Sequence, residues 1–104
     1  MRRSHLLDMT EAIERLEITG RVQGVFYRKW ARDAARSLGL RGFVRNRSDG
    51  SVEAVVAGPQ ESIDAFAEAC RKGPERAQVS SVRRSAAKAS DVAGYDGVFV
   101  ADDA

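Results

Sequence analysis

The stretch GRVQGVFYRKW, residues 20–30, places two glycines and an arginine where an apolar strand pattern changes to a helical one. Gly20 and Gly24 have no Cβ atom, so the main chain can turn tightly and approach a ligand closely. The first N–H groups of a helix lack partners within the helix and carry the positive end of its dipole. Arg28 adds a planar, permanently charged fork that suits a tetrahedral oxyanion. The stretch therefore predicts an oxyanion site, above all for phosphate, formed by residues 23–28.

Asn46 is the second residue whose type and position suggest chemistry. It lies in GFVRNRSDG, a segment that is otherwise apolar or basic, and asparagine is depleted in strands. Two interpretations stay open: Asn46 begins the turn at Asp49-Gly50, or its carboxamide points to the same place as Arg28 and orients a water molecule. The loop is open to a plainer interpretation too, because G-x-x-x-G is a weak motif and Arg28 would also suit a solvated helix surface. We interpret Asp49 and Glu53 as turn and strand-edge residues.

Seven segments of regular pattern must position these residues. Their order is strand, helix, strand, strand, helix, strand and a short last strand. They fall at about residues 16–19, residues 27–38, the hairpin GFVRNRSDGSVEAVVAG with its turn at Asp49-Gly50, the helix between Pro59 and Gly73-Pro74, Val79 to Val82, and the edge strand 98–101. The first helix has an apolar side that begins at Tyr27 and a glycine, Gly39, at its end. Residues 85–97 are small and polar, and we expect them to be flexible.

Two βαβ-like halves in a short chain predict a ferredoxin-like α/β sandwich. This α+β fold, βαββαβ, has a four- or five-stranded antiparallel sheet with both helices on one face. We expect residues 1–11 to form a flexible N-terminal leader and residues 12–104 to form a single domain, because 104 residues suffice for one core. The fold serves enzymes, metal chaperones and RNA binders, so it does not by itself indicate a chemistry.

The composition of the chain is that of an ordinary globular protein. The chain is 43% hydrophobic and 31% charged, with no apolar run near the roughly 20 residues that span a bilayer. Without a secretory signal pattern in MRRSHLLDMT, we expect a cytoplasmic location, no membrane contact and a monomer. The net charge of +2 comes from signs mixed along the chain, so we expect no nucleic-acid binding. Cys70, the single cysteine, is predicted to be buried, and His5 lies in the leader, so neither a thiol nucleophile nor a metal site is expected.

Three segments together resemble the acylphosphatase family. They are ITGRVQGVFYR, GFVRNRSDGSVEAVVAG and GPQESIDAFAEACRKGPERAQVSSV, in the family's order, and they cover about residues 14–83. The resemblance implies hydrolysis of the carboxyl–phosphate anhydride of an acyl phosphate to a carboxylate and inorganic phosphate. It also implies no cofactor, no metal and no phosphoenzyme, with catalysis by positioning and charge stabilisation.

The resemblance assigns roles residue by residue. Arg28 matches the arginine that binds the phosphoryl oxygens, and Asn46 matches the asparagine that orients the attacking water. The phosphate-binding loop corresponds to Gln23, Gly24, Val25, Phe26, Tyr27 and Arg28. The expected partners are a small acyl phosphate and inorganic phosphate, which is both product and inhibitor.

The chain departs from the family at two places. Tyr27 stands where Phe or Met is more common, so its hydroxyl needs a partner if it is buried. The end of the chain, FVADDA, lacks the basic or aromatic finish common in relatives. One alternative is a non-catalytic ferredoxin-like module that binds anions or RNA, although Phe43 is the only aromatic residue of the central hairpin. Another is the N-terminal part of a hydrogenase-maturation carbamoyltransferase, in which zinc-binding cysteine motifs should follow, whereas this chain ends at Ala104.

Overall fold

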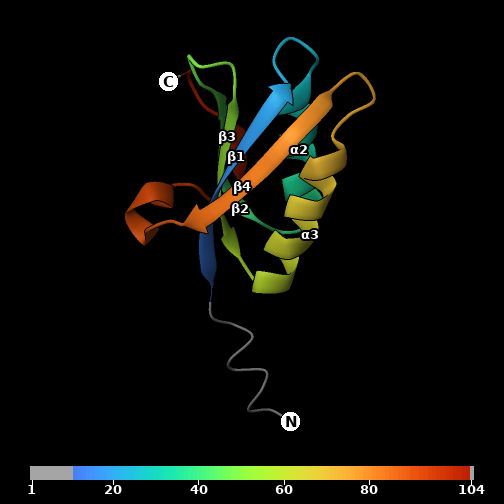
Figure 1. Cartoon of the computed structure of the whole chain (residues 1–104). Coiled ribbons are helices and arrows are strands. Elements are labelled where there is room, and N and C mark those ends of the chain that lie inside the picture. The colour runs from blue at the N-terminus through green and yellow to red at the C-terminus, as the bar shows by residue number, and fades with distance from the viewer. Residues whose placement is uncertain (1–10, 104) are drawn as a thin grey trace.

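A computed structural model describes residues 11–103 and shows one β-sheet with two α-helices packed on one side (Figure 1). In chain order the elements are β1 (Ala12–Arg21), α2 (Tyr27–Ser37), β2 (Arg41–Asn46), β3 (Val52–Gly58), α3 (Gln60–Lys72), β4 (Gln78–Ala86), the 3₁₀ turn η1 (Ala89–Val92) and β5 (Val98–Val100). The strands lie in the order β4-β1-β3-β2-β5. This arrangement confirms the ferredoxin-like sandwich with both helices on one face.

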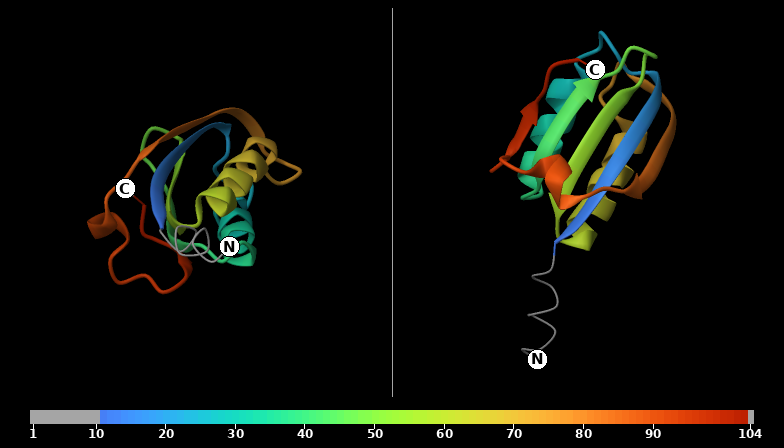
Figure 2. Two further views of the ribbon diagram at one scale, coloured as in Figure 1. Left: turned by 90° about the horizontal axis from the view of Figure 1, so that it is seen from below. Right: turned by 90° about the vertical axis from the view of Figure 1, so that its left-hand side faces the viewer.

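The fifth strand makes the sheet mixed instead of wholly antiparallel. The pairs β1–β3, β1–β4 and β2–β3 are antiparallel, whereas β5 pairs parallel to β2. After β4 the chain crosses the sheet face that the helices leave open, and it reaches the far edge running in the same direction as β2 (Figure 2). The predicted edge strand 98–101 is therefore confirmed, and its parallel direction follows from this crossing.

Helix α2 begins one residue before Arg28 and ends in a glycine cap. Tyr27, Ala31 and Ala35 are its buried residues, as the apolar spacing predicts. Gly39 has a φ of 73°, and the N–H of Leu40 donates to the carbonyl of Ala35 over 3.1 Å. This is the Schellman pattern, in which a left-handed glycine lets the chain reverse and satisfy the last carbonyls of the helix.

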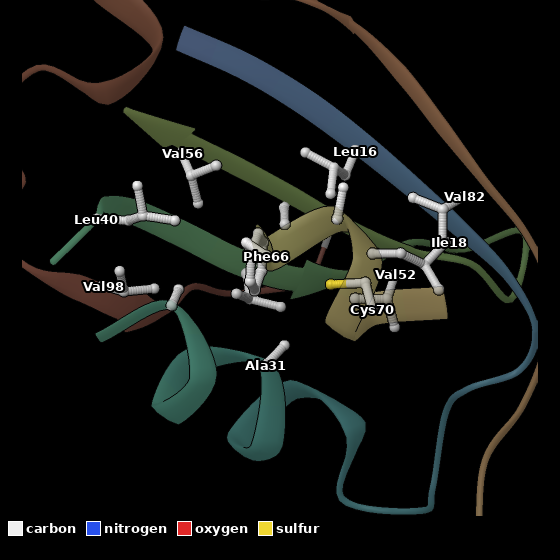
Figure 3. Close-up of a cluster of buried hydrophobic side chains, with 14 of the residues drawn as sticks. Leu16, Ile18, Ala31, Leu40, Val52, Val56, Phe66, Cys70, Val82 and Val98 are labelled. Carbon is white, nitrogen blue, oxygen red and sulfur yellow. The ribbon is translucent and has the colours of Figure 1, made fainter. Parts of the chain in front are cut away.

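The core lies between the sheet and the two helices. Alternate residues of the strands point toward the helices, and α3 contributes the predicted apolar stripe (Figure 3). The stripe consists of Ile63, Phe66, Ala67 and Cys70, all of them buried. Burying side chains of this size stabilises a fold by about 1.5–3 kcal/mol for each large apolar residue. The core fixes α2 and the end of β2 relative to each other.

Residues 85–97 are more ordered than their composition predicts. Strand β4 continues to Ala86, and η1 follows on the open face of the sheet. In the right-hand view of Figure 2 this segment lies in front of the strands and the helices lie behind them. Val92 is fully buried there against Val55 and Ala57. Val92 and the ring of Tyr95, which packs against Phe43, hold the segment, and two such residues do not stand out from their polar neighbours in the sequence.

Strand β1 is longer than the predicted residues 16–19. It pairs on both sides, with β3 and with β4, so main-chain hydrogen bonds extend it beyond the part with alternating hydrophobicity. Gly20 lies within β1 at an irregularity of the β4 pairing, with a φ of 121°. A Cβ atom there would lie 2.2 Å from the carbonyl oxygen of Gln78. Gly20 therefore serves the close approach of β1 and β4, and the prediction that it approaches a ligand is wrong.

The predicted leader, residues 1–11, lies outside the described residues except for Glu11. The Glu11 carboxylate accepts two hydrogen bonds from the guanidinium of Arg41, over 2.8 and 3.1 Å. Within residues 11–103, the helices are too short and too polar to cross a bilayer.

Candidate active site

A cavity of about 320 Å³ opens where the loop between β1 and α2 meets the end of β2. In Figure 2 (right) this loop, the β2–β3 hairpin and the C-terminal end all lie at the same end of the sheet. The lining residues are Val22, Gly24, Phe26, Tyr27, Arg28, Lys29, Asn46 and Val100. The structure thus brings Arg28 and Asn46, from separate elements, to one cavity.

The loop that leads into α2 has the main-chain geometry of an anion cradle. Gly24 has a φ of 74° and Phe26 a φ of 61°, and Phe26 is the one non-glycine residue of residues 11–103 with a positive φ. The handedness of the chain therefore alternates over residues 23–27, an arrangement that turns successive N–H groups toward one point. Within the described part of the chain, no N–H of residues 23–28 donates to a main-chain carbonyl. These donors are free for a ligand, and the helix dipole adds positive potential.

Phe26 adopts a conformation that is unfavourable for its type. A residue with a Cβ atom pays on the order of 1 kcal/mol to enter the left-handed region. Its side chain does not recover this cost by packing, because 80% of it is exposed. Strain of this kind is typical of ligand-binding loops, and here it lies at the N-cap residue of α2.

Two residues of the loop hold it in place and do not line the cavity. The Gln23 side chain donates from Nε2 to the carbonyl oxygens of Arg47 and Ser51, both over 2.9 Å. Val25 packs against the edge of the core. Gln23 thereby fixes the loop to the β2–β3 hairpin, which carries Asn46 at its near end.

Tyr27 attaches the start of α2 to the end of α3. Its buried hydroxyl donates to the carbonyl oxygen of Cys70 over 2.7 Å. In a continuing helix this carbonyl would accept from residue 74, but Pro74 has no N–H. The family departure at Tyr27 thus supplies a donor to a carbonyl that the helix cannot satisfy. Burial raises the pKa of the Tyr27 phenol.

Cys70 is a packing residue, as predicted. Its side chain is fully buried, and burial raises the pKa of the thiol to about 12. A thiol in this state supplies almost no thiolate near neutral pH, so it is a poor nucleophile.

Arg28 lies in the first turn of α2 with 38% of its side chain exposed. Its Nη1 donates to Oδ1 of Asp103 over 3.1 Å. The segment FVADDA by itself gives no sign of a contact with Arg28. The parallel pairing of β5 with β2 carries the C-terminal residues to this end of the sheet, and a pattern of three apolar residues does not reveal that direction.

Asn46 is the last residue of β2 and pairs with Val52 of β3. Alternation along β2 places it on the same side as Val44, which faces the helices. Its Oδ1 is buried and has no hydrogen-bond partner among the described residues. A buried acceptor without a partner costs about 1–3 kcal/mol, so this carbonyl oxygen does not stabilise the fold.

The turn after β2 begins at Arg47 and not at Asn46. The N–H of Gly50 donates to the carbonyl of Arg47 over 3.1 Å, and the N–H of Arg47 donates to that of Ser51 over 2.9 Å. Only Gly50 of this loop takes a positive φ, so the loop is a type I turn over residues 47–50 followed by a bulge, and not a two-residue turn at Asp49-Gly50. The Asp49 carboxylate accepts from the hydroxyl and the N–H of Ser51, which lowers the pKa of Asp49.

Glu53 is a buried central-strand residue, so its interpretation as a strand-edge residue is wrong. Only 1% of its side chain is exposed, and it ion-pairs with three arginines on the open face of the sheet. Arg45 lies 2.6 Å from it, Arg47 lies 3.6 Å away, and Arg15 also contacts it. A buried carboxylate needs such partners, because desolvation of an unpaired charge is costly.

The cationic groups at the cavity are Arg28 and Lys29. Within residues 11–103, no group of three or more His, Cys, Asp or Glu side chains is placed to hold a metal ion. His5 lies outside the described residues. The donors at the cavity, which are N–H groups, a guanidinium and a carboxamide, suit an oxyanion.

The fold and the cavity define a small ferredoxin-like α+β domain with an oxyanion cradle at the start of its first helix. The family model for acylphosphatase matches residues 14–96. An acylphosphatase of Azorhizobium caulinodans is 55% identical over 74 residues, which are 71% of this chain and 80% of that protein. An acylphosphatase of Azoarcus sp. is 48% identical over 89 residues, which are 86% of this chain and 91% of that protein. The chain belongs to the acylphosphatase family.

A solved structure agrees with this membership. The structure of an acylphosphatase from Coxiella burnetii matches with a TM-score of 0.80 at 36% identity, covering 88% of this chain and 93% of that one. The predicted family, the fold and an enzyme that hydrolyses acyl phosphates are confirmed. Family membership does not by itself assign roles to individual residues.

Proposed function

We propose that Arg28 and the main-chain N–H groups of residues 23–28 bind the phosphoryl group of an acyl phosphate, and that Asn46 orients the water that attacks it. The observation that carries the proposal is the convergence of three kinds of polar group at one cavity. These are the free loop amides, the guanidinium fork and the carboxamide. Together they provide charge and direction without any group that would have to form a covalent bond.

The reaction requires little proton transfer from the protein. The water oxygen forms a bond to phosphorus while the bond from phosphorus to the carboxyl oxygen breaks. The carboxylate leaves with the electron pair and needs no general acid, because it is a stable anion. The proton of the water passes to an oxygen of the phosphoryl group itself. Negative charge on the equatorial oxygens meets Arg28 and the amides, which are already in position.

Arg28 must exchange partners when the substrate binds. Its Nη1 contacts Asp103, and this ion pair is largely exposed on the carboxylate side. An exposed ion pair is worth about 0–1 kcal/mol, so a doubly charged phosphoryl group displaces it at little cost. The remaining N–H groups of the fork are available for phosphoryl oxygens.

The alternative of an RNA-binding module loses its structural support. Such a module displays aromatic rings on its open sheet face, and Phe43 lies on that face. Its ring, however, stacks on Tyr95 with centroids 5.6 Å apart, and the guanidinium of Arg45 lies over it at 5.3 Å. These contacts occupy the ring that a base would need.

Hydrolysis of benzoyl phosphate by the purified protein tests the proposal. We expect turnover with EDTA present, competitive inhibition by inorganic phosphate, and a loss of kcat/KM of roughly 100-fold or more in Arg28→Ala, the scale of a transition-state charge contact. Arg32→Ala is the matched control, because Arg32 lies on the same helix, pairs with Asp33 and does not line the cavity. Equal kcat/KM in Arg28→Ala and Arg32→Ala would refute the role of Arg28. Activity that EDTA abolishes and a divalent metal restores would refute the metal-free mechanism.

A further inference from the structure

Part of the cavity wall is apolar and exposed. Phe26, Phe99 and Val100 are the large apolar side chains that residues 11–103 leave exposed, and two of them, Phe26 and Val100, line the cavity. The Phe26 side chain is 80% exposed and that of Val100 is 40% exposed. Phe99 does not line the cavity. Val22 extends the apolar lining from the buried side. Exposed apolar groups gathered at one cavity favour a site for an apolar part of a ligand.

The position of Phe26 links this wall to the anion cradle. Its own N–H belongs to the free amides of residues 23–28, while its ring projects into solvent at the mouth of the cavity. A phosphoryl group held by these amides therefore has the Phe26 ring beside it. The left-handed backbone of Phe26 costs free energy, and its exposed ring gains none by packing within the protein.

Val100, on strand β5, lines the cavity beside the end of β2. Strand β5 pairs parallel to β2, with Val100 in register with Val44. Val44 precedes Asn46 by two positions on the same face of β2, so Val100 flanks the strand end that carries the carboxamide. The acyl group of a bound substrate is joined to the phosphoryl group by one oxygen, so it lies close to the residues that line the cavity.

We propose that Phe26 and Val100 form the acyl-binding wall of the site and that they favour acyl phosphates with an apolar, aromatic acyl group over those with a small one. This inference rests on the proposed function of the cavity. The phosphoryl contacts are common to all acyl phosphates, whereas the wall contacts grow with the apolar surface of the acyl group.

The test compares two substrates in each variant, benzoyl phosphate and acetyl phosphate, as the ratio of their kcat/KM values. Intrinsic reactivity and any damage to the cradle affect both substrates and cancel in the change of this ratio. In Val100→Ser we expect the ratio to fall by roughly fivefold, the change that accompanies lost contact with a few tens of Å² of apolar surface. Phe26→Asn should lower it similarly, and asparagine tolerates the left-handed backbone better than most residues.

Phe99→Ser is the matched control, since Phe99 adjoins Val100 in β5 and is similarly exposed but lies outside the cavity. A ratio that falls in the Val100 and Phe26 variants and not in the Phe99 variant supports the acyl wall. An unchanged ratio in both wall variants overturns it, as does an equal fall in Phe99→Ser, which would indicate general disruption of β5. If the wild-type protein hydrolyses neither substrate, the proposed function fails first and the acyl wall fails with it.

Discussion

Single residues at this site differ in what they do for stability and for chemistry. Tyr27 and Gln23 use their polar atoms within the protein, whereas Asn46 leaves a buried acceptor without a partner and the Arg28 side chain is 38% exposed. Satisfied buried groups stabilise a fold, and unsatisfied ones are retained where a ligand needs them. The contrast separates the positioning residues from those proposed to contact the substrate.

Removing the Tyr27 hydroxyl should destabilise the fold. Tyr27→Phe leaves the buried Cys70 carbonyl without a donor, since Pro74 has no N–H to replace it. We expect the free energy of unfolding in urea to fall by about 1–3 kcal/mol. Tyr95→Phe is the control, with an expected change within about 0.5 kcal/mol, because Tyr95 contributes chiefly ring stacking. A Tyr27→Phe variant as stable as wild type would show that the hydroxyl does not matter to the fold.

The elements of the domain place these residues through a few specific contacts. The loop before α2 is fixed to the β2–β3 hairpin by the carboxamide of Gln23, and α3 is fixed to the sheet edge by Arg84. The first contact determines the distance between the cradle and Asn46. The second lies at a distance from the cavity and contributes to the stability of the whole domain.

Loss of the Gln23 contact should affect the site more than the fold. In Gln23→Ala the carbonyls of Arg47 and Ser51 still accept one main-chain hydrogen bond each, so we expect the free energy of unfolding to change by less than about 1 kcal/mol. The loop would no longer be held against the hairpin, and we expect kcat/KM for benzoyl phosphate to fall by roughly tenfold or more. Urea unfolding and steady-state kinetics on the same sample measure both. Wild-type kinetics in this variant would exclude the positioning role.

The Arg84 contacts should make the stability depend on pH. The Arg84 guanidinium, on β4, donates to Glu14 of β1 over 2.8 Å and to Asp64 of α3 over 2.7 Å. These hydrogen bonds lower the pKa of both carboxyls from their ordinary values of 4.5 and 3.8. Because the folded-state pKa values are lower than the unfolded ones, this stabilisation is complete above the ordinary values and is lost as the pH falls through the folded-state values.

We therefore expect Arg84→Met to be less stable than wild type at pH 7 and to lose less stability between about pH 5 and pH 2. Arg83→Met is the control with the same change of charge, since Arg83 is 76% exposed and lies 3.7 Å from Glu17. Urea unfolding at several pH values measures the difference. If Arg84→Met and wild type lose stability in parallel below pH 5, the contacts of Arg84 do not cause the acid dependence.

At the scale of the whole molecule, the sequence predicted correctly those structural features that depend on residues close together in the chain. The helical period from Tyr27, the glycine cap at Gly39 and the apolar stripe of α3 appear as predicted. Each of them depends on residues within a few positions of one another. The two motifs also identified Arg28 and Asn46, and the cavity joins them.

Long-range features of the molecule were not predictable in the same way. Asp103 reaches Arg28, and Val100 reaches the cavity, because the chain crosses the open sheet face and pairs parallel to β2. A three-residue edge strand does not indicate which neighbour it takes. Glu53 looked like an edge residue because its partners, among them Arg15 on a different strand, are not adjacent in sequence. Gly20 looked like a ligand-binding glycine because its contact with β4 is also distant in the chain.

The most direct test of the central claim measures phosphate binding and turnover separately in Arg28→Ala and Asn46→Ala. Isothermal titration with inorganic phosphate reports the cradle, and benzoyl phosphate hydrolysis reports the oriented water. We expect Arg28→Ala to lose roughly tenfold or more of its phosphate affinity together with its turnover. Asn46→Ala should keep its phosphate affinity within about threefold while kcat falls by roughly 100-fold. Wild-type turnover in Asn46→Ala, or wild-type phosphate affinity in Arg28→Ala, would contradict the account.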